Sequence, residues 1–532
     1  MRRLLAIAAI AAAAVVVVPS PASAASAGCT VQYTVGSQWP GGFNAGVEIT
    51  NTGAALSGWS LGWDFTAGQH IDHMWQAVYT TSGRHVTASN QTFNGNVPAG
   101  GKVLFGFNGS WTGSNPVPGA FTLNGVACNG GTSTPDLHVD NPFQGAQGYV
   151  NADWSARAAA EAGGGRVANT STAVWIERIA AVADVRRHLD AALAQATTAK
   201  PVVVQFVLRD LPARDCTKPR PDGELTAADL SRYETEFIDP IAAIQADPKY
   251  DRVRIVNVVE PDGLTDLIVG ANMQSCANVL ASGVYVQGTQ YALNRLHRAN
   301  AYNYLGAGHH AKLGWDPDFT AAVTLFADTA RGSTAGVNAV DGFAVNTADY
   351  GATTEPYFTI ATTVGGVSIR QSRWIDWNQY VDELTYTQAL RAALIAAGFP
   401  STIGMLVDTS RNGWGGPARP TGASTSTSVD TFVDQSRIDR RSVAGNWCNQ
   451  SGAGLGERPR TSPAPGIDAY VWIKPPGESD GAATGGNLSC DSTYSGSGNG
   501  YHPTGALPGA PARGSWFSAQ FQQLMTNAFP PL

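Results

Sequence analysis

The residues of this sequence that could do acid–base chemistry stand where apolar segments end. Val256-Asn-Val-Val-Glu-Pro-Asp262 is a run of β-branched residues that reaches a proline and then an aspartate. Proline cannot continue the hydrogen-bond ladder of a strand, so we expect Asp262 in the loop directly after a buried strand. Asp215, Asp408 and Asp480 follow other apolar runs. Paired carboxylates in such places can divide the roles of proton donor and of base or charge partner.

The segments that must position these aspartates alternate between two patterns from about residue 137 to the end of the chain. Six apolar runs predict strands, at residues 202–208, 253–259, 301–305, 340–345, 403–407 and 469–473. Amphipathic runs between them predict helices, for example at residues 227–244, 278–298, 381–397 and 517–527. This alternation predicts an α/β fold, most simply a distorted (β/α) barrel, although six strands do not establish a complete eight-fold one. Two carboxylates at neighbouring strand ends are what cleavage of a glycosidic bond requires.

The first part of the mature chain has a different pattern. Residues 28–129 contain short runs of alternating apolar and polar residues, separated by Asn-Gly and Gly-Gly turns, which predict an all-β sandwich. Residues 130–136, Gly-Gly-Thr-Ser-Thr-Pro-Asp, are small or polar and are interpreted as a short linker to a second domain, residues 137–532.

Residues 1–27 predict a secretory signal peptide. Arg2 and Arg3 precede an apolar run from Leu4 to Val18, and cleavage after either Ala24 or Ala27 fits the small residues that follow. We therefore expect a soluble, secreted, extracellular protein. Six cysteines in an exported chain predict three disulfides, and of the 15 possible connectivities their positions favour local pairs: Cys29 with Cys128, Cys216 with Cys276, and Cys448 with Cys490.

Composition and spacing argue against several classes of partner. The net charge of −7 argues against nucleic acid or an anionic membrane. No Cys/His spacing typical of zinc is present, and the adjacent pair His309 and His310 is interpreted as structural, so no metal or cofactor is expected. We expect a monomer.

Residues 137–532 resemble glycoside hydrolase family 6. The matching motifs follow the family's order and span nearly the whole domain: Leu211-Pro-Ala-Arg-Asp-Cys216, Val259-Glu-Pro-Asp262, Leu313-Gly-Trp315, Gly445-Asn-Trp-Cys448, Gly454-Leu-Gly456 and Trp472-Ile-Lys-Pro-Pro-Gly-Glu-Ser-Asp-Gly481. The resemblance implies an inverting hydrolase of β-1,4-glucan, and the long segments between residues 411 and 441 look like the tunnel-forming loops of bacterial cellobiohydrolases.

The same resemblance implies a role for individual residues. Asp262 matches the general acid, Asp215 the neighbouring carboxylate that raises the acid's pKa, and Asp480 the base or charge partner. Substrate contacts are implied for Trp447, Trp315, Lys474, Glu478 and Arg411. The pairs Cys216–Cys276 and Cys448–Cys490 match the family's two disulfides.

Four positions near one sugar subsite depart from the family's pattern. Arg209 stands for a tyrosine, Pro221 for a serine, Gly306 for an aspartate and Lys312 for a sugar-stacking tryptophan. These changes leave open a catalytically silent cellulose-binding protein, or a hydrolase of another β-glucan, as alternatives to an exo-acting cellulase that releases cellobiose.

Residues 28–129 resemble a family 2 carbohydrate-binding module. The resemblance rests on the bracketing cysteines, Ser37-Gln-Trp39, Gly46-Val-Glu-Ile-Thr-Asn-Thr52, Ile71-Asp-His-Met-Trp75 and Phe105-Gly-Phe-Asn-Gly109. It implies cellulose binding through a flat aromatic strip made by Trp39, Trp75 and Phe93, because planar rings can cover the apolar face of a sugar. Trp59 and Trp63 are instead predicted to lie in the core.

Overall fold

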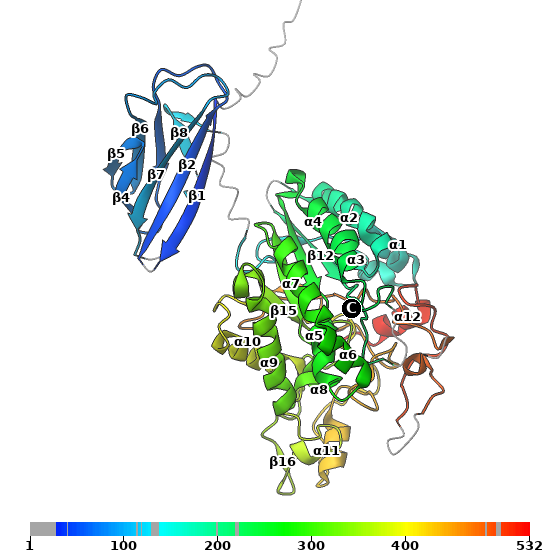
Figure 1. Cartoon of the computed structure of the whole chain (residues 1–532). Coiled ribbons are helices and arrows are strands. Elements are labelled where there is room, and N and C mark those ends of the chain that lie inside the picture. Colours follow the sequence, from blue (N-terminus) through cyan, green and yellow to red (C-terminus); the bar gives the residue numbers. More distant parts are fainter. Residues whose placement is uncertain are drawn as a thin grey trace, which may run out of the picture. The chain divides into compact units, whose positions relative to one another are not determined.

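The computed structural model describes residues 28–39, 41–112, 115–118, 120–128, 138–197, 200–218, 223–484, 487–495 and 502–532. The chain divides into two compact units, Met1–Asp136 and Leu137–Leu532 (Figure 1). The expected signal peptide and linker lie outside the described residues. None of the helices in the described part has both the length and the apolar character needed to cross a bilayer.

The N-terminal unit consists of two antiparallel sheets. The first has the order β1-β2-β7-β4 and the second β5-β6-β3-β8-β9. The strands are β1 (Cys29–Trp39), β2 (Gly42–Asn51), β3 (Ser60–Asp64), β4 (His70–Trp75), β5 (Ala77–Ser82), β6 (His85–Asn90), β7 (Lys102–Ser110), β8 (Phe121–Leu123) and β9 (Val126–Ala127). Trp59 and Trp63 are each 2% exposed and stack near Phe105 and Phe107 in the core, as predicted. The predicted all-β fold is confirmed.

The C-terminal unit contains a curled sheet of mostly parallel strands. Its strands are β10 (Gln147–Gly148), β11 (Val174–Ile176), β12 (Val202–Leu208), β13 (Val253–Val259), β14 (Ala301–Gly306), β15 (Gly342–Val345), β18 (Gly404–Asp408), β19 (Arg460–Thr461) and β20 (Ala469–Val471). The order is β10-β12-β13-β14-β15-β18-β20-β19, with β11 also pairing with β12. Ala173 donates a backbone hydrogen bond to the carbonyl of Trp472 (3.0 Å), so the two ends of the sheet approach each other beside β11 and β20. The predicted distorted barrel is confirmed.

Side chains alternate between the two faces of this sheet. Val203, Val207, Val256 and Val258 belong to a buried cluster inside the barrel, whereas their neighbours along the strands belong to a larger cluster against the helices. Both faces of the strands are therefore buried, which explains their nearly continuous apolar sequences. Polar side chains are located mainly where the strands end.

The helices cover the outside of the barrel. They are α1 (Ala152–Ala160), α2 (Val182–Gln195), α3 (Leu230–Arg232), α4 (Asp239–Gln245), α5 (Gly263–Val269), α6 (Gln274–Ser282), α7 (Val284–Leu296), α8 (His310–Leu313), α9 (Asp316–Arg331), α10 (Glu383–Ala396), α11 (Val429–Ser436) and α12 (Ser518–Thr526). A π-helical segment, Tyr233–Ile238, joins α3 to α4. A short hairpin, β16 (Thr363–Val364) and β17 (Val367–Ser368), projects from a long loop after β15. The single helix expected over 278–298 is wrong, because Gly283 has φ +70° and separates α6 from α7.

Candidate active site

A cavity of about 320 Å³ is lined by residues that follow five of the parallel strands. Four of the predicted residues in its wall are Asp215 after β12, Asp262 after β13, and Lys474 and Asp480 after β20. Trp447 lines it as well, from a loop that follows α11. Carboxylates from distant parts of the sequence therefore face one enclosed space.

Asp262 lies in the loop between β13 and α5, as its proline predicts. Its side chain is 44% exposed, and two cations face it. Arg209 Nε lies 3.3 Å from Asp262 Oδ2, and Lys312 Nζ lies 3.7 Å from Oδ1. Lys312 also binds Asp266 at 2.9 Å. The candidate proton donor is thus accessible to a ligand but surrounded by positive charge.

Glu260, two residues earlier, is a structural carboxyl. Its backbone has φ +45°, and Glu260 is not among the residues that line the cavity. Oε1 accepts hydrogen bonds from the Asp210 backbone N–H and the Tyr233 hydroxyl, both at 3.0 Å. Burial raises its pKa to about 7. Glu260 thereby joins the loops after β12 and β13.

Arg209 links three carboxylates from a buried position. Nη2 lies 2.6 Å from Asp215 Oδ1, Nε 3.3 Å from Asp262, and Nη1 3.3 Å from Glu177 Oε1. Lys218 Nζ binds the same oxygen of Asp215 at 2.7 Å. Asp215 itself has φ +64° and its side chain is 1% exposed. The charge of Asp215 is therefore balanced by two cations.

These contacts determine the ionisation of Asp262. Burial raises its pKa, but the attraction of Lys312, Arg209 and Lys218 is stronger, so the net pKa lies below the usual value. The repulsion from Asp215 acts in the opposite direction and is smaller. These cations thus favour the ionised form of Asp262.

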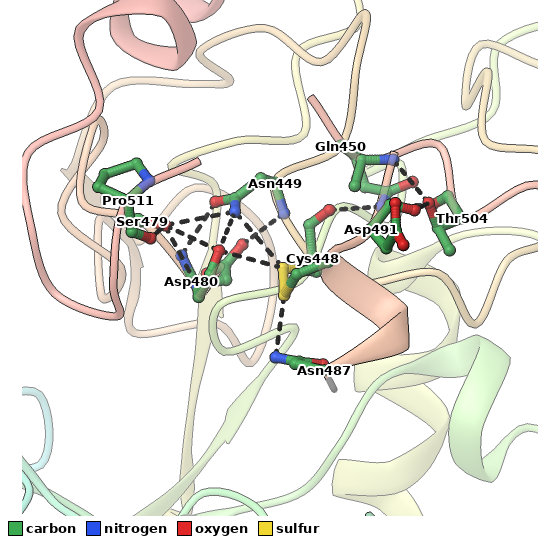
Figure 2. Close-up of a disulfide and its surroundings, with 12 residues drawn as sticks. Cys448, Asn449, Gln450, Ser479, Asp480, Asn487, Asp491, Thr504 and Pro511 are labelled. Carbon is green, nitrogen blue, oxygen red and sulfur yellow. Dashed lines mark hydrogen bonds between the residues drawn. A yellow bond between two sulfur atoms is a disulfide. The ribbon is translucent and has the colours of Figure 1, made fainter. Parts of the chain in front are cut away.

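Asp480 is fixed by a set of donors from several loops. Arg411 Nη1 contacts both of its carboxylate oxygens, at 2.9 and 2.7 Å, and the Tyr350 hydroxyl donates to Oδ2 at 3.1 Å. Asn449 N–H donates to Asp480 Oδ2 at 2.8 Å, while Asp480 N–H donates back to Asn449 Oδ1 at 2.9 Å (Figure 2). Burial raises the pKa of Asp480, but Arg411 and Lys474 together bring it below its usual value. Asp480 therefore remains a carboxylate.

The predicted direct substrate contact of Arg411 is not available in this structure. Its side chain has no exposed surface and is occupied by Asp480, so it positions that carboxylate. Glu478 is 19% exposed, lies 3.7 Å from Arg157, and does not line the cavity. Trp315 is half-buried. It lines a small hollow next to the cavity, and Ala311 also lines this hollow.

Disulfides hold the loops next to two of the aspartates. Cys216–Cys276 directly follows Asp215 and ties its loop to α6. Cys448–Cys490 adjoins Asn449 (Figure 2). Trp447 precedes Cys448 and Ser489 precedes Cys490, and both of these residues line the cavity. Together with Cys29–Cys128, these are the pairs that the sequence positions favour.

Asp408 organises the rim without facing the cavity. It accepts backbone hydrogen bonds from Ala348 (2.9 Å), Ser410 (3.0 Å), Ile473 (3.2 Å) and Lys474 (2.9 Å). These donors lie after β15, β18 and β20. Asp408 therefore holds the loops after these strands together, although its place after an apolar run resembles that of Asp262.

Each of the adjacent histidines faces a carboxylate of the protein. His310 Nδ1 lies 2.6 Å from Glu383 Oε1, and its backbone N–H donates to Glu383 Oε2 at 3.1 Å. His309 Nε2 faces Asp349 at 3.3 Å and lines the cavity. His309, His310 and Glu383 could offer three ligand atoms within 4.8 Å, but Glu383 already uses both oxygens on His310.

Comparisons with known proteins identify the C-terminal unit. The family model "Glycosyl hydrolases family 6" matches residues 133–528. The chain belongs to glycosyl hydrolase family 6. It is 44% identical over 432 residues to exoglucanase A of Cellulomonas fimi, covering 75% of this chain and 49% of that protein. It is 34% identical to a probable 1,4-β-D-glucan cellobiohydrolase C of Aspergillus niger, and the match covers 73% of this chain and 78% of that protein.

Solved structures agree with this assignment. The catalytic domain of Cellulomonas fimi Cel6B matches with a TM-score of 0.71 and 43% identity, covering 74% of this chain and 96% of that one. The chain spans about half the length of the Cellulomonas exoglucanase.

The family 6 domain differs from the family's pattern at positions that the structure now places. Arg209 and Lys312 both line the cavity and face Asp262. At Gly306, a Cβ atom would lie 2.2 Å from Pro261 Cα, so the loop that carries Asp262 packs directly on this glycine. The fourth position, Pro221, lies outside the described residues.

The N-terminal unit matches the model "Cellulose binding domain" over residues 29–128. Trp39, Trp75 and Phe93 are 48%, 41% and 69% exposed. Trp39 pairs in register with Gly42 and Trp75 with Gly106, and each indole lies across its glycine. Glycine leaves room for the ring to lie on the sheet surface.

Several residues that shape the site were missed by sequence reasoning. They are Glu177, Lys218, Asp266, Tyr350 and Asn449. Lys218 could have been found, because it lies three residues after Asp215 beside a disulfide. Glu177 follows β11, a three-residue strand with too little pattern to recognise.

Proposed function

We propose that this chain is a secreted cellulose-degrading glycoside hydrolase that cleaves β-1,4-glucosidic bonds with inversion. The observation that carries the proposal is the meeting of Asp262, Asp215 and Asp480 in one cavity of a family 6 domain. The relatives' names, exoglucanase and cellobiohydrolase, support cellulose as the substrate and exo action with cellobiose release, and they favour a hydrolase over a silent binding protein.

In this mechanism Asp262 donates a proton to the leaving glycosidic oxygen. Its carboxyl is the exposed one, whereas Asp215 is buried beneath Arg209. Asp480 remains ionised and stabilises the positive charge that develops on the sugar ring. Water attacks the anomeric carbon from the face opposite the leaving group and passes its proton to solvent water. Its bonds to Arg411, Tyr350 and Asn449 support the role of charge partner over that of a proton acceptor.

The surrounding features support the rest of the proposal. Lys474 and Trp447 line the cavity and are positioned to bind the sugar. The loops joined by Cys448–Cys490 form part of the cavity wall, which favours an enclosed site and exo action. Three disulfides favour an oxidising, extracellular location. The N-terminal module, with Trp39, Trp75 and Phe93, would keep the monomeric enzyme on cellulose.

The test is the release of soluble sugar from amorphous cellulose by the purified chain and by Asp262→Asn. We expect the wild type to release mainly cellobiose and the variant to lose about 10²–10⁴-fold in rate, as is typical for loss of a general acid. Asp184→Asn, at an exposed carboxylate on α2, is the matched control and should retain activity. Cellulose binding without hydrolysis of any β-glucan would instead support the silent binding protein.

A further inference from the structure

Three tryptophans in the long loops have no assigned role: Trp374, Trp377 and Trp414. Their exposure and contacts differ in the structure. Trp414 is 1% exposed and donates its indole N–H to the Tyr350 carbonyl, so it belongs to the core. Trp374 is covered by the guanidinium of Arg437, 3.7 Å from the ring centre. Trp377 is 56% exposed. Only Trp377, of these three, offers its ring to solvent.

Trp377 is the neighbour in sequence of a residue that contacts Trp315. Ala311 lines both that cavity and the adjacent small hollow, whose wall also contains Trp315 and Trp374. The indole N–H of Trp315 donates to the carbonyl of Asp376 at 2.7 Å, directly before Trp377. Trp377 therefore lies close to Trp315, outside the residues that line the catalytic cavity.

The backbone holds Trp377 in an unusual conformation. Its φ is +64°, a region that bulky residues rarely adopt and that is retained only where the surroundings impose it. Arg370 supplies the restraint: its carbonyl accepts from the Trp377 N–H at 2.7 Å, and its Nη2 donates to the Trp377 carbonyl at 2.8 Å. The guanidinium also lies 5.8 Å from the ring centre. The backbone that carries this exposed indole is thus held by Arg370.

We propose that Trp377 is an additional sugar-binding platform, which stacks on a glucosyl unit of a β-glucan chain beyond Trp315. A rigid planar ring covers the apolar face of a pyranose and leaves its hydroxyls in water. Beside it, the exposed pair Gln379 and Asp316, joined at 2.6 Å, offers polar groups for those hydroxyls. The identity of the ligand as a β-glucan rests on the proposed function.

The experiment compares Trp377→Ala with the wild-type full chain on cello-oligosaccharides of four and of six or more units. A platform beyond Trp315 contacts only the longer ligands, so we expect KM for these to rise roughly three- to tenfold, the range typical of one aromatic contact. KM for cellotetraose and kcat should change little. Trp377→Tyr should restore most of the affinity, because it keeps a planar ring.

Phe529→Ala is the matched control. Phe529 is also an exposed aromatic residue, 42% exposed, with a guanidinium, that of Arg419, 3.5 Å from its ring centre. It does not line the catalytic cavity. Equal KM values for long oligosaccharides in wild type and Trp377→Ala would overturn the proposal. If the wild type hydrolyses no oligosaccharide, the proposed function fails, and calorimetric binding of cellohexaose to the same variants still decides the role of Trp377.

Discussion

At the scale of residues, the site combines the carboxylates of a glycosidase with an unusual set of cations. Arg209 and Lys312 both approach Asp262, and their charges outweigh the burial that would otherwise raise its pKa. A general acid must carry its proton when the leaving group departs. If Asp262 is the general acid, as proposed, its protonated fraction limits the rate as the pH rises.

Lys312→Gln tests this electrostatic control. Removing the lysine charge raises the pKa of Asp262, so more of the enzyme is protonated at a given pH. On the alkaline side of the pH profile, kcat/KM should rise by about tenfold for each unit by which the pKa increases. The measurement is kcat/KM on a soluble oligosaccharide across the acidic range. Lys249→Gln, at an exposed lysine that pairs with Asp190, should leave the pH profile unchanged. If the alkaline limb of Lys312→Gln does not shift, Lys312 does not control the protonation of the catalytic acid.

At the scale of elements, the loops after β12 and β13 are joined by a buried carboxyl. Glu260 accepts from Asp210 of one loop and from Tyr233 of the π-helical segment. Its pKa is about 7 in the fold, well above the ordinary value for glutamate. The fold is therefore stabilised by the protonated form, fully at pH values below the unfolded-state pKa and no longer once the pH has risen through 7.

Glu260→Gln removes this dependence while retaining an oxygen that can accept both hydrogen bonds. Between pH 4.5 and 8 the wild type should lose on the order of 2–3 kcal/mol more stability than the variant. Urea denaturation at several pH values measures the difference. Glu236→Gln, at an exposed glutamate of the π-helical segment that pairs with Arg232, serves as the control. Parallel stability curves for wild type and Glu260→Gln would show that the pKa of Glu260 is not raised in the fold.

The elements also show what the sequence could and could not predict. The long apolar strands β12 and β13 were predicted at their observed bounds, because burial on both faces makes their sequences continuous. The strands β10, β11 and β19 were missed, since two or three residues carry too little pattern to recognise. The consequence of Gly306 could not be judged either, because its contact with Pro261 joins two different strand ends. Aspartates at strand ends could be found from the sequence, whereas the cations that face them depend on tertiary packing.

At the scale of the whole molecule, one chain carries two compact units, and we propose that both contact cellulose. The cavity of the C-terminal unit is lined by charged groups, whereas the N-terminal unit presents exposed rings on its surface. A second binding event on one chain raises the effective concentration of the first, even when each is weak. Turnover on insoluble cellulose should therefore depend on the strength of the aromatic strip, and turnover on soluble oligosaccharides should not.

Phe93→Trp tests whether the aromatic strip affects turnover on insoluble cellulose alone. Phe93 is the most exposed ring of the strip, and an indole presents a larger planar surface to a glucan chain. We expect adsorption to crystalline cellulose to strengthen roughly two- to fivefold, a gain of under about 1 kcal/mol. The measurement is a depletion isotherm, together with sugar release from crystalline cellulose and from cellohexaose. Val126→Trp, at an exposed residue outside the strip, controls for added hydrophobicity. If Val126→Trp strengthens adsorption as much as Phe93→Trp does, the cellulose-binding role is not located at Phe93. An equal increase in sugar release by Phe93→Trp from cellohexaose would contradict it as well.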